Sequence, residues 1–206
     1  QTPSNPQPAS YTLGQWLEEW LSVYVATSVR PTTYASYQML VESHFKPTLV
    51  DGKPLGKYKL SELRPIHVQK YMAEKRKAGL SNTTIRYHYR TLRRALDLAK
   101  ANDYIESNPA HGAVPPPPME PDLGVWSAEE AARFLWEIRD HWAYSLFATA
   151  ILTGMRRGEI VGLTWPAVDF QRGRLWVNQT VVYDGNKIVV QPAPKTKKGR
   201  RSVAIG

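Results

Sequence analysis

The chain has 206 residues, and its 27 Lys and Arg residues outnumber its 18 Asp and Glu residues, which gives a formal net charge of +9. It contains 42% hydrophobic residues, enough to fill a core, and no cysteine, which excludes a disulfide framework, a thiol nucleophile and a cysteine-ligated zinc. The longest nearly apolar run, residues 142–152, is shorter than the roughly 20 residues that a membrane helix needs. We therefore expect a cytoplasmic protein with a polyanionic partner and no membrane contact.

The positive charge is concentrated in two segments. Residues 61–100 contain 10 basic and 3 acidic side chains, and residues 171–206 contain 8 and 1. Between them, residues 101–170 contain 4 basic and 10 acidic side chains. This distribution favours two separate contact surfaces for a polyanion, and lysine-rich solvated helix faces are the alternative.

The first half of the chain predicts a helical domain. Residues 1–10 are polar and rich in proline, which is typical of a flexible tail. From residue 11 to residue 112, apolar residues recur at intervals of three and four in four segments that Gly, Pro and Asp-Gly turns separate. The predicted helices cover about 12–25, 31–41, 61–77 and 82–101, and a loop or small hairpin covers 47–58.

The last of these helices has a basic side. Arg86, Arg90 and Arg93 recur at i, i+4 and i+7, with Arg94 beside them and a single acidic residue opposing them. Like charges this close on one helix destabilise it unless an anion lies nearby. The pattern favours a helix that faces phosphates or a DNA groove, and a solvated helix face is the alternative.

Residues 113–124 predict an interdomain linker, because the run A-V-P-P-P-P from Ala113 is stiff and cannot form a helix. Residues 125–206 then predict a second domain that begins with a capping box at Ser127. A helical period gives way to a period of two, so the whole chain is expected to be mainly α with a small antiparallel β-sheet. The predicted elements are a helix from 127, a buried helix over 142–153, a helix over 156–163, and strands over 175–183, 187–191 and 202–205.

One side chain stands out as a candidate for chemistry. Arg156 follows the apolar helix directly, and burying an unpaired guanidinium is costly, so it needs a carboxylate or an anionic ligand. Glu159, three residues later, is a suitable carboxylate. The spacing alone is equally consistent with a structural ion pair and with an anion site, and it indicates no reaction.

Three stretches of the chain resemble the tyrosine recombinases, or phage integrases. The segment Thr153–Trp165 (T-G-M-R-R-G-E-I-V-G-L-T-W) is similar throughout to the stretch that holds the family's first catalytic arginine. The segment Lys195–Ile205 (K-T-K-K-G-R-R-S-V-A-I) is similar to the stretch that holds its catalytic lysine, although less closely around Gly199 and Ala204. The helical segment from Ser81 to Pro109 is similar to the core-binding domain, so the resemblance spans about residues 11–206.

The resemblance implies a four-helix, SAM-like core-binding domain followed by an incomplete α+β catalytic domain. It implies a bacterial or phage-encoded protein of a mobile element that cleaves and rejoins DNA through a phosphotyrosyl intermediate. The implied partners are double-stranded attachment-site DNA and, in the full-length protein, further copies in a tetramer. It also implies that Arg156 binds the scissile phosphate, that Glu159 supports the site, and that Lys195 is the general acid for the leaving 5′-hydroxyl. No metal or other cofactor is required.

One departure from the family's pattern is important. In the family a histidine–x–x–arginine pair, a further His or Trp and the tyrosine nucleophile follow the lysine segment, whereas this chain ends at Gly206. All five histidines precede Arg156, and Tyr183 precedes Lys195. We therefore expect this chain to bind duplex DNA without forming a covalent adduct.

Two other functions remain open. The chain could be a non-catalytic DNA-binding regulator or decoy on the same fold, or an RNA-binding or generally basic protein. The last alternative leaves the segments around Arg156 and Lys195 unexplained. The residues predicted to contact DNA are Arg64, Lys70, Arg86, Arg90, Arg93, Arg94, Arg157, Lys197, Lys198, Arg200 and Arg201.

Overall fold

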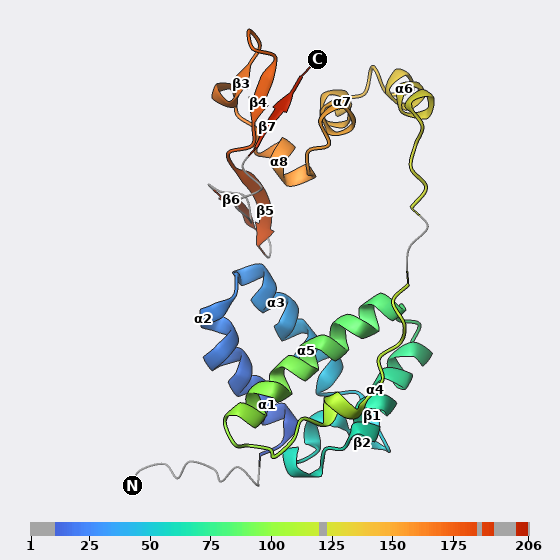
Figure 1. Ribbon diagram of the computed structural model, residues 1–206, viewed down its shortest axis with the longest axis vertical. Helices are drawn as coiled ribbons and strands as arrows, with labels where there is room; N and C mark the ends of the chain where they lie inside the picture. The colour runs from blue at the N-terminus through green and yellow to red at the C-terminus, as the bar shows by residue number, and fades with distance from the viewer. Residues whose placement is uncertain (1–10, 120–122, 185–186, 192–200, 206) are drawn as a thin grey trace. The chain divides into compact units, whose positions relative to one another are not determined.

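The computed structural model describes residues 11–119, 123–184, 187–191 and 201–205 (Figure 1). The chain divides into two compact units, Gln1–Pro121 and Asp122–Gly206. The flexible tail predicted for residues 1–10 lies outside the described residues. Within the described parts of the chain, no helix is both long and apolar enough to cross a membrane.

The first unit is built from the four predicted helical segments. Two of them begin at the predicted caps, because the hydroxyl groups of Thr12 and Ser81 accept hydrogen bonds from backbone N–H groups in the first turn. Gly79, at φ 83°, follows the third segment, as its position in the sequence indicated. The helices are α1 (Leu13–Glu19), which continues as a π-helical turn (Trp20–Val25) and α2 (Ala26–Ser28); α3 (Pro31–Leu40), which continues as a π-helical turn (Val41–Phe45); α4 (Pro65–Lys77); and α5 (Asn82–Ala101).

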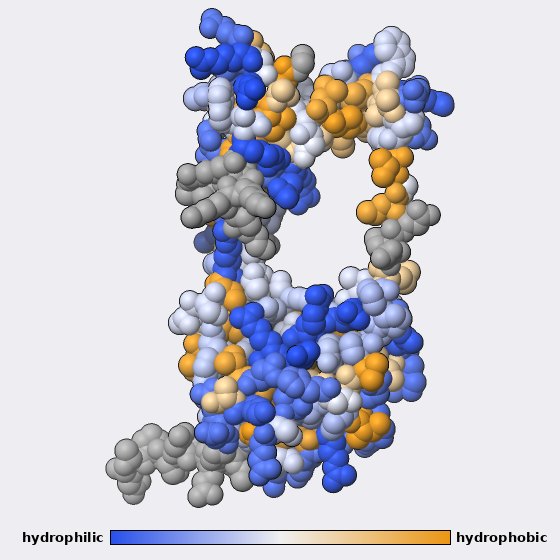
Figure 2. All heavy atoms as spheres, viewed as in Figure 1, coloured by the Kyte–Doolittle hydropathy of each residue, from blue (hydrophilic) through white to orange (hydrophobic). Residues whose placement is uncertain are grey.

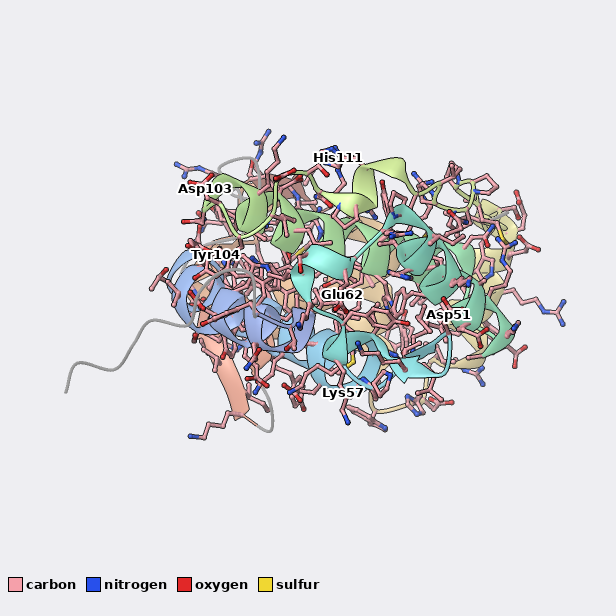
Figure 3. All side chains as sticks on the ribbon, turned by 90° about the horizontal axis from the view of Figure 1, so that it is seen from below. Asp51, Lys57, Glu62, Asp103, Tyr104 and His111 are labelled. Atoms are coloured by element: carbon pink, nitrogen blue, oxygen red, sulfur yellow. The ribbon has the colours of Figure 1, made fainter. Side chains whose placement is uncertain are left out.

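A small antiparallel hairpin lies between the second and third helical segments, as predicted. Its strands are β1 (Leu49–Val50) and β2 (Lys53–Pro54), joined by Asp51 and Gly52 at positive φ. Figure 3 shows Asp51 beside α4, where its carboxylate pairs with Lys70. Short 3-10 turns cover Leu55–Lys57, Leu60–Glu62 and Pro109–Gly112.

The core of the first unit contains several aromatic residues among its aliphatic ones, and it includes one buried polar pair. Trp16 is fully buried, and its indole N–H donates a 2.9 Å hydrogen bond to the carbonyl of Ala95, which joins α1 to α5. His88 is 1% exposed, and its Nδ1 lies 2.8 Å from the buried hydroxyl of Tyr71. A buried polar side chain with a partner avoids the cost of an unmade hydrogen bond.

Part of the predicted linker packs on the first unit. The N–H of Val114 donates to Oε1 of Gln69 at 2.9 Å, and Arg86 and Asn82 donate to the carbonyls of Pro116 and Pro117. A pocket of about 300 Å³ beneath this segment is lined by side chains of α4 and α5 and is mainly apolar. The prolines therefore have defined contacts here, which the composition of the segment did not indicate.

The described residues of the second unit form three helices and two small sheets. Strands β3, β4 and β7 form one antiparallel sheet in that order, and β5 and β6 form a separate antiparallel hairpin. The prediction of one continuous strand over 175–183 is wrong, because the chain leaves the first sheet after Trp176 and pairs again from Thr180. The elements are α6 (Ala128–Glu137), α7 (Tyr144–Thr153), α8 (Arg157–Val161), β3 (Val168–Asp169), β4 (Arg174–Trp176), β5 (Thr180–Asp184), β6 (Lys187–Gln191) and β7 (Ser202–Ala204), with a 3-10 turn over Trp165–Ala167.

The prediction that the apolar helix before Arg156 is buried is also wrong for the described structure. No residue of α7 is buried, and Leu152 and the preceding Trp142 are 75% and 88% exposed. Figure 2 shows apolar residues at the surface of this helix. Hydrophobicity on every side shows that a helix can be buried, but burial also requires neighbours on every side. In the described residues α7 contacts α6, where the rings of Phe134 and Phe147 meet, and α8.

Candidate phosphate site and nucleic-acid interface

The candidate site lies at the junction of α7 and α8. Gly154 ends α7 in the left-handed conformation, with φ 62°, which lets the chain turn sharply. Met155 is buried against Leu175 of β4 and thereby anchors the turn to the sheet. Arg156 is extended and occupies the cap position of α8. The backbone of Arg156 is therefore held between a buried anchor and a helix start.

Arg156, Glu159 and Arg201 form an ion cluster. The backbone N–H of Arg156 donates to Oε2 of Glu159 at 3.0 Å, and its Nη1 donates to Oε1 at 3.0 Å. The terminal nitrogens of Arg201 bind the two carboxylate oxygens separately, at 3.2 and 2.8 Å. The pairing of β4 with β7 brings Arg201 to this place, because the N–H of Val177 donates to the carbonyl of Arg201 at 2.9 Å.

Electrostatics keep this carboxylate ionised. The hydrogen bonds from Arg201, together with the backbone and side-chain bonds from Arg156, lower the pKa of Glu159 to about 2, although burial of the group opposes the shift. The same contact with Glu159 raises the pKa of Arg201. Two guanidinium charges and one carboxylate charge leave the cluster with a net charge of +1.

The three side chains differ in how far solvent reaches them. The side chain of Glu159 is 4% exposed and that of Arg201 is 31% exposed, whereas that of Arg156 is 78% exposed. Among the described residues, Arg156 makes side-chain hydrogen bonds only to Glu159, so most of its donors face solvent. A guanidinium held in this way is suited to bidentate binding of a phosphate. Arg157, the next residue, is also exposed.

Two glycines of the same segment allow α8 to approach the hairpin. A Cβ atom at Gly158 would lie 2.5 Å from the carbonyl oxygen of Val181 and 2.7 Å from Oγ1 of Thr180. A Cβ atom at Gly162, one turn later, would lie 3.2 Å from Cα of Thr180, and the carbonyl of Gly162 accepts a 2.8 Å hydrogen bond from the side chain of Gln179. The glycines therefore have a packing role that the sequence analysis did not assign.

Most of the basic side of α5 is exposed, which fits both a surface that faces phosphates and a solvated helix face. Arg90, Arg93 and Arg94 are exposed, and Figure 2 shows strongly hydrophilic residues over this helix. Arg86 is only partly exposed, because it donates to the carbonyl of Pro116 at 2.7 Å. The exposed guanidinium groups make α5 a candidate surface for a nucleic-acid backbone.

The other predicted site residues have different settings. Arg64 is exposed at the start of α4, and Lys70 forms an ion pair with Asp51. Arg201 is engaged with Glu159, a pairing across 42 positions that no spacing pattern could indicate. In the part of the chain that the structure describes, no three His, Asp or Glu side chains converge to hold a metal. The predicted residues that lie outside the described part are Lys195, Lys197, Lys198 and Arg200.

Comparison with known proteins gives matches to integrases along most of the chain. The model of the phage integrase N-terminal SAM-like domain matches residues 12–76. A XerC-like tyrosine recombinase of Caldanaerobacter subterraneus is 28% identical over 94% of this chain and 52% of its own length. The ICEBs1 integrase of Bacillus subtilis is 25% identical over 90% of this chain and 50% of its own length. The chain thus spans about half the length of these curated relatives.

Solved structures with the same fold include integrases bound to DNA. The integrase of transposon Tn1549, in complex with a circular intermediate DNA, superposes with a TM-score of 0.79 at 20% identity and covers 96% of this chain and 62% of its own. A lambda integrase dimer bound to a core site gives 0.68 at 15% identity, with 88% and 62% covered. The fold is therefore that of DNA integrases, mainly helical with small antiparallel sheets. In sequence, the chain is similar to a tyrosine recombinase and to integrases along most of its length.

Proposed function

We propose that this chain is the DNA-binding and partial catalytic portion of a site-specific recombinase that binds duplex attachment-site DNA. One observation carries the proposal: Arg156 is fixed by the buried carboxylate of Glu159, yet its own side chain is 78% exposed. A structural ion pair would have no need to leave the guanidinium open to solvent, whereas a phosphate-binding group requires this.

The chemistry fits the geometry. Cleavage of a phosphodiester builds negative charge on the non-bridging oxygens, and fixed donors at developing charge are commonly the largest catalytic contribution. Arg156 would supply such donors without losing its proton. Glu159 would orient it, and Lys195, by resemblance to the family, would protonate the leaving 5′ oxygen.

The proposal extends to the two domains and to assembly. Residues 11–112 would contact DNA through the basic side of α5, and residues 125–206 would contact it around Arg156, with residues 113–124 joining them. The lambda integrase structures include a dimer on a core site and a tetramer on a Holliday junction. We extend oligomer formation to the full-length protein.

Salt-dependent binding tests the DNA interface. In a fluorescence anisotropy titration with duplex DNA flanking the chain's own gene, Arg90→Ala with Arg94→Ala should reduce the slope of log affinity against log salt by about one unit per lost phosphate contact. Lys77→Ala is the matched control, because this exposed lysine pairs with Glu74 on α4. An unchanged slope in the double variant would show that these arginines face solvent in the complex.

A suicide substrate tests the chemistry. The full-length protein should form a covalent adduct that Arg156→Ala abolishes with only a modest loss of binding. The chain of residues 1–206 alone should form none. A non-catalytic regulator on the same fold would instead bind the DNA and form no adduct even at full length.

A further inference from the structure

We propose that Arg201 is a positioning residue for Arg156: it holds the charge of Glu159 so that the guanidinium of Arg156 stays available to a phosphate. This inference rests on the proposed function of Arg156. The basic segment around Arg201 favoured a role for this residue in binding DNA. We assign it a contact inside the protein instead.

Two arginines share the carboxylate of Glu159 unequally. Glu159 is 4% exposed and accepts hydrogen bonds from both Arg156 and Arg201, but Arg201 binds both oxygens while the side chain of Arg156 binds one. Bidentate pairs are the stronger ones. The main neutralising partner of Glu159 is therefore Arg201.

Loss of Arg201 would change the bonds that Arg156 makes. A buried carboxylate that loses a guanidinium is left undercompensated, and this is strongly unfavourable. Among the described residues, Arg156 is the other cation that bonds Glu159, so it would turn its second terminal nitrogen toward this carboxylate. The pair would then carry no net charge, and the donors of Arg156 that face solvent would be used inside the protein.

The backbone of Arg201 is anchored to the first sheet of the second unit. Its carbonyl accepts a hydrogen bond from Val177, and the next residue begins β7, which pairs with β4. The backbone of Arg201 is thereby fixed to the sheet. A residue with an anchored backbone, a side chain 31% exposed and both terminal nitrogens on Glu159 is better placed to hold its neighbour than to reach for DNA.

A double-mutant cycle on DNA binding tests the inference. Arg201→Gln should lower the salt-dependence slope by about one unit, because the phosphate contact of Arg156 is lost. In the Glu159→Gln background the same substitution should leave the slope unchanged, because no carboxylate remains to capture Arg156. A loss of about one unit in both backgrounds would identify Arg201 as a direct phosphate contact and overturn the inference. Arg174→Gln is the matched control, since it removes one exposed positive charge from β4 and donates to Ser202 rather than to Glu159.

A second readout needs no DNA. Phenylglyoxal modifies accessible arginines, and peptide mapping by mass spectrometry gives the rate at Arg156. We expect this rate to fall several-fold in Arg201→Gln and to return to the original rate when Glu159→Gln is added. An unchanged rate at Arg156 in Arg201→Gln would overturn the inference. If the original chain bound no DNA, the proposed function would fail, whereas the modification rates would still decide the role of Arg201.

A separate control measures whether each variant is folded. Thermal unfolding by circular dichroism identifies any variant that is unfolded at the assay temperature. Arg201→Lys then serves as the conservative variant, because lysine keeps the charge but cannot form two parallel bonds to a carboxylate. Its modification rate at Arg156 should lie between those of the original chain and Arg201→Gln. A rate equal to that of the original chain would mean that charge alone, without the bidentate geometry, holds Glu159, which contradicts the positioning role as stated.

Discussion

Arg86 of α5 donates a 2.7 Å hydrogen bond to the carbonyl oxygen of Pro116, 30 positions along the chain. The guanidinium of Arg86, which we expected to face DNA, therefore bonds the first part of the predicted linker. The neighbouring contact from Val114 to Gln69 holds the same segment against α4. Arg86 thus connects the linker segment to the basic side of α5, together with the longer bond from Asn82 to Pro117.

Removing Arg86 should loosen this segment. Arg86→Ala deletes a charge-assisted hydrogen bond at a partly exposed site, which we expect to cost about 1 kcal/mol of local stability. Because prolines carry no N–H, Val114 is the reporter, and hydrogen exchange at its amide should become about five- to tenfold faster, as that free energy implies. Arg90→Ala, on the same helix, should leave the exchange unchanged. Equal exchange in the Arg86 variant and the original chain would mean that the contact adds no stability.

The buried histidine predicts a loss of stability in mild acid. Burial, with smaller contributions from His44 and Lys75 nearby, lowers the pKa of His88 to about 4. The unfolded chain, with a pKa near 6.5, binds a proton between about pH 6.5 and 4 that the folded chain does not bind. Stability contributed by neutral His88 is therefore present above pH 6.5 and falls as the pH drops toward 4.

The free energy of unfolding of the first unit should be about 2 kcal/mol lower at pH 5 than at pH 7. Urea unfolding at the two pH values measures this difference. His88→Gln, which can still bond Tyr71 but does not titrate, should remove most of that pH dependence. The pKa of His44 is also lowered by burial, so a smaller slope should persist. If His88→Gln kept the full pH dependence of the free energy of unfolding, groups other than His88 would be responsible for it.

The cap of α5 makes a simpler prediction. Oγ of Ser81 accepts a 3.3 Å hydrogen bond from the N–H of Thr84. Ser81→Ala should lower the free energy of unfolding of the first unit by about 1 kcal/mol, whereas Ser81→Asp should preserve it, because a carboxylate also caps and favours the helix N-terminus. Urea unfolding of both variants checks this, and equal losses would indicate that the hydroxyl is not the stabilising contact.

The sequence predicted features that depend on local chemistry. The bounds of α5 follow from Ser81 and the apolar stripe, and the start of α6 follows from the capping box at Ser127. Features that depend on distant partners were missed. The pairing of Glu159 with Arg201 requires knowing that β7 returns beside β4, and the exposure of α7 depends on which elements cover it.

The motif around Arg156 also has features that the sequence predicted and features that depend on distant residues. Its resemblance to the family identified the arginine and the glutamate, and the structure adds the geometry that makes one exposed and the other buried. Glycine spacing in the motif was visible in the sequence. Its purpose was not, because the atoms that approach Gly158 belong to β5, more than twenty residues later.

Close packing at Gly158 gives the sharpest test of the second unit. Alanine is normally the better helix residue, by about 1 kcal/mol, so propensity alone predicts that Gly158→Ala stabilises α8. The added Cβ would however lie 2.5 Å from the carbonyl oxygen of Val181, a backbone atom that cannot rotate away. Overpacking of this kind costs about 1–3 kcal/mol, so the clash outweighs the propensity and the sign is destabilising.

Thermal unfolding of the second unit should therefore shift to lower temperature in Gly158→Ala. Gly124→Ala is the matched control, because a Cβ there meets nothing within 4 Å. The variant should also speed phenylglyoxal modification of Glu159-bound Arg201, since α8 must move away from the hairpin to make room. A melting temperature at or above that of the original chain would show that α8 does not approach β5 this closely in solution. The close approach of α8 to β5 could then not explain where the ion cluster of Arg156, Glu159 and Arg201 lies.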